Sequence, residues 1–209
     1  MFKDMRARFC KKDSAIYFSH LDLNRAVMRA LRRSGIPFWS TGGFSPHPYC
    51  IFAQPLSLGF ESEGELFDFR VTDDFDPADL LAAFPESLKI LEIYEPVDHF
   101  KTIAWADYRV ELRTDADAEA VRKAYDGPMT VLKKTKRSEK EVDLREFIRS
   151  VSVEETEDGV VLYATVAAGN DRSLSPNYLA EGLKGVGISA EICRVCRLAF
   201  RKEDGDLIR

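Results

Sequence analysis

The order in which strand and helix patterns follow one another is the strongest constraint that this sequence places on its fold. Segments with apolar residues at every second position alternate with segments whose apolar residues recur every three or four positions, which are the periods of strands and helices. The order strand, helix, strand, strand, helix, strand occurs twice, over residues 5–94 and 108–200. Within it, residues 36–39 and 66–71 are predicted strands, and Thr114 is predicted to cap a helix that ends near Tyr125. This order predicts an α+β protein of two ferredoxin-like (βαββαβ) halves, with one domain over residues 1–98 and another over 104–209.

The first predicted strand carries two arginines on one side. Met5, Ala7 and Phe9 alternate with Arg6 and Arg8. Because successive side chains of a strand point to opposite faces, both arginines should lie on the face that turns away from the core. We therefore count Arg6 and Arg8 among the candidate anion-binding residues.

A helix is predicted over residues 20–34. Ser19 stands where an N-cap belongs, Asp22 completes a variant of the capping box, and Gly35 ends the helix. An apolar stripe and an arginine stripe follow the same spacing two residues apart, which separates them by roughly 200° around the helix. The apolar stripe consists of Leu23, Val27, Ala30 and Leu31, and the arginine stripe of Arg25, Arg29, Arg32 and Arg33. The arginines form either a solvated face or a contact with an anionic partner, and the single carboxylate among them favours the partner.

A loop rich in glycine and proline follows over residues 41–48. Glycine permits positive φ angles and proline stiffens the chain, so this segment should be a shaped loop. The backbone N–H groups of Gly42 and Gly43 could bind an anion. The loop lacks the Lys-Ser/Thr ending of a phosphate-binding loop and the GxGxxG pattern of a dinucleotide fold, so both of those sites are excluded.

The charge of the chain is unevenly distributed. The net charge is −5, yet residues 1–49 contain nine Lys and Arg against three Asp, a net charge of +6, which leaves −11 for the remainder. This asymmetry predicts an anionic partner for the N-terminal part.

The histidines and cysteines are the remaining candidates for chemistry. If the loop folds over the helix start, His20 and His47 could form an acid–base pair or, with Asp22, part of a metal site. Spacing identifies no further ligand, so no bound metal and no cofactor are expected. Cys193 and Cys196 form a lone CxxC in a predicted strand, which favours small core residues over a redox or zinc site.

Several motifs of the N-terminal half resemble those of a known family. They are Arg6-x-Arg8-Phe9, Ser19-His20-Leu21-Asp22-Leu23, Gly43-Phe44-Ser45-Pro46-His47-Pro48, Pro55-Leu56-x-Leu58-Gly59 and Glu65-x-x-Asp68. With the arginine-rich helix they resemble the radical SAM-linked protein family, a bacterial domain family of unknown function encoded beside or fused to a radical SAM protein. The resemblance is strong over residues 5–70. It implies a radical SAM protein as partner and transfers no catalytic residue, because the family has none established.

Two classes of function remain open. In the first, the chain is a non-catalytic accessory module that presents RNA or another anionic substrate to a separate radical SAM enzyme. The residues expected to contact the anion are Arg6, Arg8, Arg25, Arg29, Arg32, Gly42 and Gly43. In the second, the chain is itself an enzyme, such as a metal-independent RNA-cleaving protein with His20 or His47 as general base. We prefer the first class.

The location of the protein is predicted from two features of the sequence. No apolar run approaches the ~20 residues of a membrane span, and no signal-peptide core follows Met1. Both features predict a cytoplasmic protein without a membrane partner.

Overall fold

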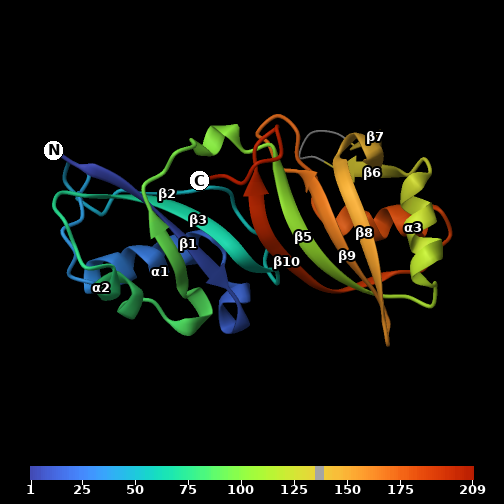
Figure 1. Ribbon diagram of the computed structural model, residues 1–209, viewed down its shortest axis with the longest axis horizontal. Helices are drawn as coiled ribbons and strands as arrows, with labels where there is room; N and C mark the ends of the chain where they lie inside the picture. Colours follow the sequence, from blue (N-terminus) through green and yellow to red (C-terminus); the bar gives the residue numbers. More distant parts are fainter. Residues whose placement is uncertain (135–138) are drawn as a thin grey trace. The chain divides into compact units, whose positions relative to one another are not determined.

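The structure, a computed structural model, describes residues 1–134 and 139–209 and divides into two compact units (Figure 1). Unit 1 comprises residues 1–100 together with Arg209, and unit 2 comprises residues 101–208. Both units combine helices with antiparallel strands, so the protein is of the α+β class. Among the described residues, no helix is long and apolar enough to cross a membrane.

Unit 1 is built on a sheet in which the strands follow the order β4-β1-β3-β2. Every neighbouring pair is antiparallel. The elements are β1 (Lys3–Lys11), α1 (His20–Arg33), β2 (Cys50–Phe52), β3 (Glu61–Val71), α2 (Pro77–Ala82) and β4 (Ile90–Tyr94).

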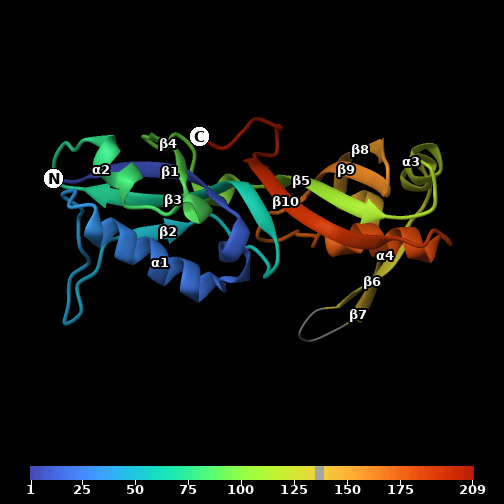
Figure 2. The same cartoon turned by 90° about the horizontal axis from the view of Figure 1, so that it is seen from below.

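The core of unit 1 forms where the helices meet one face of this sheet (Figure 2). Alternate residues of the two central strands face it, Ala7 and Phe9 from β1 and Phe67 and Phe69 from β3. The buried residues of α1 are the four of the predicted apolar stripe, Leu23, Val27, Ala30 and Leu31. The opposite face of the sheet, which we call the outer face, carries the residues between these.

Local sequence signals define both ends of α1, as predicted. The Ser19 hydroxyl accepts a hydrogen bond from the Asp22 N–H at 3.2 Å, and the Asp22 carboxylate accepts one from the Ser19 N–H at 3.3 Å. This reciprocal capping box satisfies N–H groups that a helix start leaves without partners. At the other end Gly35 adopts a φ of 72°, a conformation that glycine tolerates best.

The third strand is longer than the sequence pattern predicted. β3 begins at Glu61 rather than at Leu66, because the polar residues before Leu66 pair with the end of β1. Ser62 and Glu65 are buried there, opposite the end of β1, where Lys11 is buried as well. The strand expected near residues 36–39 is reduced to one bridge between Phe38 and Val71.

Unit 2 contains a sheet in the order β10-β5-β9-β8 and a separate hairpin of β6 and β7. The helix expected to start after Thr114 begins at Ala118, because the Asp117 carboxylate accepts the capping hydrogen bond from Ala120 N–H at 2.7 Å while the Thr114 hydroxyl donates to Ser189 O. The elements are β5 (Trp105–Arg113), α3 (Ala118–Asp126), β6 (Thr130–Lys134), β7 (Glu139–Asp143), β8 (Ile148–Thr156), β9 (Gly159–Ala167), α4 (Asn177–Gly185) and β10 (Glu191–Arg201).

Candidate nucleic-acid interface

The exposed surface of α1 is strongly basic. Arg25, Arg29, Arg32 and Arg33, which we call the arginine face, are all exposed. Arg25 lies 3.9 Å from the Asp22 carboxylate, and Arg33 donates to the backbone carbonyl of Ala83 at 2.9 Å. The side chains of Arg29 and Arg32 form no ion pair or hydrogen bond with the described residues. At least two guanidiniums of this face are therefore available to an anion.

The sequence around the arginine face contains no compensating acid. From Leu23 to Phe60 there is no Asp or Glu, although this stretch holds four arginines and a histidine. A solvated helix surface usually mixes charges of both signs. The excess positive charge therefore belongs to α1, and the loop that follows it adds no carboxylate to offset it.

The glycine- and proline-rich segment forms the tip of a hairpin. Ser40 and Pro48 form a bridge, the Thr41 N–H donates to His47 O at 2.9 Å, and the Tyr49 N–H donates to Trp39 O at 3.1 Å. The segment is thus closed by its own backbone, in agreement with the predicted shaped loop. At its tip, Gly43 has a φ of 104° and the Phe44 side chain is fully exposed at 112%. We call residues 39–49 the hairpin.

The two candidate histidines lie at opposite ends of α1. The His20 ring starts the helix and contacts the Phe52 ring at 5.5 Å between centroids, whereas the ring of His47 is in the hairpin, with Nδ1 3.1 Å from Pro48 O. The 14 residues of α1 span about 20 Å. Figures 1 and 2 show the hairpin beside the end of α1, away from the helix start.

The prediction that the loop folds over the helix start is therefore wrong. The chain leaves α1 at its C-terminal end, and the short backbone bridges of the hairpin hold the loop there. His20 and His47 do not form an acid–base pair, and the Asp22 carboxylate contacts Ser19 and Arg25. Among residues 1–134 and 139–209, no group of three or more His, Cys, Asp and Glu side chains is arranged to hold a metal ion.

Arg6 lies on the outer face of β1, as expected, but it is fully buried. Its Nε and Nη2 atoms donate to the two carboxylate oxygens of Asp68 at 2.7 and 2.9 Å, and Nη2 also donates to Asp98 O at 2.9 Å. The Phe100 ring covers the guanidinium at 4.0 Å. The alternating pattern of the strand could not reveal that residues 98–100 cover this part of the outer face. Arg6 is committed to Asp68 and is not exposed to a ligand.

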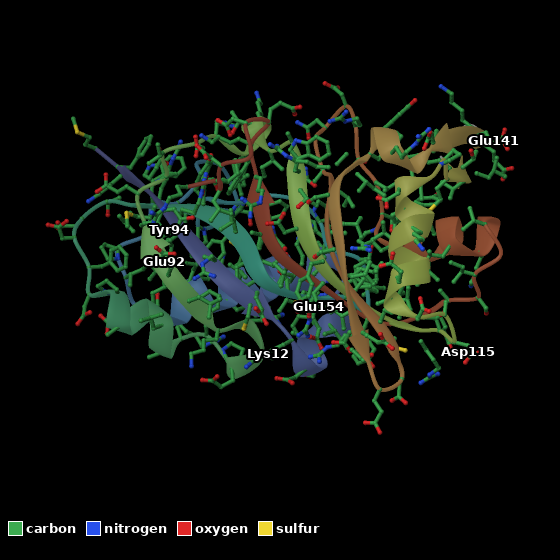
Figure 3. All side chains as sticks on the ribbon, turned by 45° about the vertical axis from the view of Figure 1, so that its right-hand side comes forward. Lys12, Glu92, Tyr94, Asp115, Glu141 and Glu154 are labelled. Atoms are coloured by element: carbon green, nitrogen blue, oxygen red, sulfur yellow. The ribbon has the colours of Figure 1, made fainter. Side chains whose placement is uncertain are left out.

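Arg8 is partly exposed on the same face and already has partners. Its guanidinium lies 3.5 Å from the Glu92 carboxylate and donates to Glu63 O at 3.3 Å. Glu92 and Tyr94 lie along β4 in Figure 3, and Arg209 lies 3.1 Å from the same carboxylate of Glu92. Of the predicted anion-binding residues, the exposed ones are Arg25, Arg29 and Arg32 on α1 and Gly42 and Gly43 in the hairpin.

A cluster of aromatic rings around Arg70 lies at the base of the hairpin. The guanidinium carbon of Arg70 is 4.0 Å from the centroid of the Tyr49 ring, 4.1 Å from that of Phe2 and 5.6 Å from that of Trp39. Arg70 Nε also donates to the Asp4 carboxylate at 2.7 Å. We call these five residues the Arg70 cluster. The cluster joins three segments that lie apart in the sequence, namely the N-terminal Phe2, the hairpin with Trp39 and Tyr49, and β3 with Arg70.

The arginine face, the hairpin and the Arg70 cluster share one end of unit 1. The hairpin follows α1 after Arg33, and its base is tied to β3, since the Trp39 N–H donates to Arg70 O at 2.7 Å. Cations, loop N–H groups and aromatic rings thus lie at one end of unit 1, which we call the hairpin end. The arginine face is on the helix side of the sheet and the Arg70 cluster is on the outer face. Phosphates and unpaired bases are the ligands that such a combination fits.

A second basic site, in unit 2, is less suited to an anion. A cavity of about 250 Å³ between α3 and β8 is lined by three arginines. Arg122 pairs with Glu119 and Arg145 with Asp143, while Arg149 donates to backbone carbonyls of the C-terminal turn. These guanidiniums already have partners, in contrast to Arg29 and Arg32.

The four cysteines differ in exposure, and not all of them are core residues. Cys196 is buried, as expected, and so is Cys10. The prediction is wrong for Cys193, which is exposed, because residues three apart on β10 point to opposite faces of the strand. Burial raises the pKa of the Cys10 thiol. Burial also raises the pKa of the Cys50 thiol strongly. Neither the Cys10 nor the Cys50 thiol therefore carries the signs of an activated nucleophile, which needs a lowered pKa.

The fold and surface define an α+β protein with a basic, partly aromatic surface on its first unit. The chain belongs to a family described as uncharacterized proteins conserved in bacteria, DUF2344, which it matches over residues 5–176. That description names no radical SAM protein. No curated protein matches the chain.

The fold is similar to that of a solved structure. It resembles a chain in the crystal structure of a Cbf5–Nop10–Gar1 complex, with a TM-score of 0.57 and 11% sequence identity over 96% of this chain and 50% of that one. The present chain therefore spans about half the length of that relative. At this identity the likeness concerns the fold alone.

Proposed function

We propose that the chain is a non-catalytic binding module that holds single-stranded RNA on the hairpin end of unit 1 and presents it, in the cytoplasm, to a separate radical SAM enzyme. The radical SAM partner is supported by the resemblance of the N-terminal motifs described above. A pair of ferredoxin-like units is supported by the strand orders β4-β1-β3-β2 and β10-β5-β9-β8, each with helices between its strands.

The observation that carries the proposal is the uncompensated charge of the arginine face. Arg25, Arg29 and Arg32 lie along about 10 Å of helix, and among the described residues they form a single ion pair, between Arg25 and the Asp22 carboxylate. Arginine contacts to phosphates supply the sequence-independent part of RNA affinity through counterion release. An exposed row of guanidiniums without carboxylate partners is suited to this role.

An enzymatic role is less well supported. RNA cleavage without a metal uses a general base and a general acid at the same phosphate. His20 and His47 lie at opposite ends of α1, so each would need another partner. Within residues 1–134 and 139–209, no carboxylate is hydrogen-bonded to either ring.

Replacing Arg25, Arg29 and Arg32 with glutamine tests the proposal. Each exposed substitution should change the free energy of unfolding by no more than about 0.5 kcal/mol. The affinity for single-stranded RNA should fall, and the slope of log K against log salt should decrease by roughly 0.7 for each phosphate that the variant no longer neutralises. Fluorescence anisotropy of a labelled oligonucleotide over a salt series measures both quantities.

The matched control removes three exposed positive charges from unit 2 instead. Arg113, Arg122 and Lys123 are more than half exposed there. Replacing them with glutamine changes the net charge equally and should leave the salt slope unchanged. An equal loss of affinity in both variants, or no loss in the α1 variant, would contradict the proposed interface. Normal RNA binding with loss of a radical SAM partner in a pull-down would show that the arginine face docks protein.

A further inference from the structure

We infer that the Arg70 cluster and Phe44 form a platform on which unpaired bases of the bound strand stack. This inference rests on the proposed function, because it concerns the same RNA at the same end of unit 1. It assigns the arginine face to the phosphates and the aromatic rings to the bases. RNA without accessible bases would then bind only through its charge.

The rings of the cluster are not part of the hydrophobic core. Phe69 and Val71 turn inward from β3 and are buried, so Arg70 between them points to the outer face. On that face Phe2 is 43% exposed and contacts the Trp39 ring, while Phe44, at the tip of the hairpin, is fully exposed. Exposed aromatic rings next to one another on a folded surface commonly mark a binding site.

The rings are held in place by backbone contacts, which favours binding. The Trp39 N–H donates to Arg70 O, and the Tyr49 N–H donates to Trp39 O. The centroids of the Trp39 and Tyr49 rings lie 6.0 Å apart and those of Phe2 and Trp39 5.7 Å apart. Because the rings are already ordered, a base that stacks on them loses little of its binding energy to ordering the protein.

The chemistry of the surface identifies the ligand class. Aromatic side chains bind any base through its π face, and adjacent arginines bind the backbone, which is the pattern of proteins that hold single strands without strong sequence preference. The Arg70 guanidinium is already occupied by three rings and Asp4, so its charge contributes less to the strand than that of Arg29 and Arg32. A duplex, whose bases are stacked internally, should bind through charge alone.

A strand without bases separates stacking from charge. We would measure, by fluorescence anisotropy, the binding of a labelled oligouridine and of an abasic strand with the same number of phosphates. The intact protein should bind the oligouridine about fivefold or more tightly, since stacking on one aromatic side chain contributes roughly this factor or more. Phe44→Ala and Phe2→Ala should weaken oligouridine binding by about fivefold or more each and leave abasic binding unchanged. Leu58→Ala, an exposed apolar residue outside the hairpin end, is the control and should change neither.

Tryptophan fluorescence provides an independent readout that does not depend on affinity. The chain has two tryptophans, and Trp105 is buried in unit 2, so a base stacked on the cluster should quench Trp39. Oligouridine should quench the intact protein, and Trp39→Phe should abolish the quenching.

The outcomes distinguish this inference from the proposed function. Equal binding of the two strands without quenching would overturn the stacking platform, while the α1 arginine variant could still show that charge holds the strand. Failure of both strands to bind would overturn the proposed function and the platform together.

Discussion

Replacing Asp68 with alanine should remove a large part of the stability of the protein. The Asp68 carboxylate accepts two hydrogen bonds from Arg6, whose side chain has an exposed fraction of 0%. Among the described residues, Arg6 Nη1 has no hydrogen-bond partner at all. Without Asp68, the guanidinium would keep only Asp98 O and the ring of Phe100.

The magnitude follows from the burial of the charge. Breaking a buried ion pair by removing one partner costs about 3–5 kcal/mol, because the other charge remains buried and unpaired. The Asp68 side chain is 21% exposed, so water can partly reach the vacated position, and we expect about 3 kcal/mol. A single domain has about 5–15 kcal/mol in total, so the loss should be plain in urea unfolding.

Two further variants serve as a control and as a rescue for Asp68→Ala. Asp4→Ala removes a carboxylate that is half exposed beside Arg70 and should cost about 1 kcal/mol or less. Arg6→Met combined with Asp68→Leu replaces the pair with apolar side chains and should recover most of the loss. If Asp68→Ala is no more destabilising than Asp4→Ala, the structural role of Arg6 is refuted and Arg6 becomes an RNA-contact candidate again.

Three other substitutions or treatments have defined outcomes. Ser19→Ala should destabilise the protein by about 1 kcal/mol. Because the Ser19 hydroxyl lowers the pKa of Asp22, that pKa should be higher in an NMR titration of the variant. In the intact protein, the ionised Asp22 carboxylate adds stability above the ordinary pKa of an Asp, and this stability should be lost as the pH falls through the lowered pKa of the folded state. Gly182→Ala places a methyl group onto buried side chains beneath α4 and should cost about 1–3 kcal/mol in thermal unfolding, whereas Gly185→Ala, whose nearest contact is at 3.5 Å, should not destabilise. In native protein a thiol reagent should modify Cys193 first, with the buried thiols reacting only on unfolding.

The parts of the structure that depend on neighbouring residues were predictable from the sequence. The start, the end and the buried stripe of α1 follow from Ser19, Asp22, Gly35 and a 3.6-residue period. The exposed arginine face follows from the same period. These features involve residues within one or two turns of one another, so tertiary contacts alter them little.

The parts that depend on strand register were not predictable. Arg6 and Asp68 meet because β1 and β3 pair in one register. Asp98, which also contacts the Arg6 guanidinium, lies 92 residues after Arg6 in the chain. Arg70 meets Phe2, Trp39 and Tyr49 for the same reason. Alternation shows which face of a strand a residue occupies, but not what covers that face.

The location of bound RNA is the most direct test of the central claim. We would add single-stranded RNA to isotope-labelled protein and follow the backbone amide signals by NMR. The largest shifts should fall in α1 from Arg25 onward, in residues 39–49 and at Arg70. Shifts confined to unit 2 or to the start of α1 at His20, or no shifts at all, would contradict the assignment of the hairpin end as the RNA-binding surface.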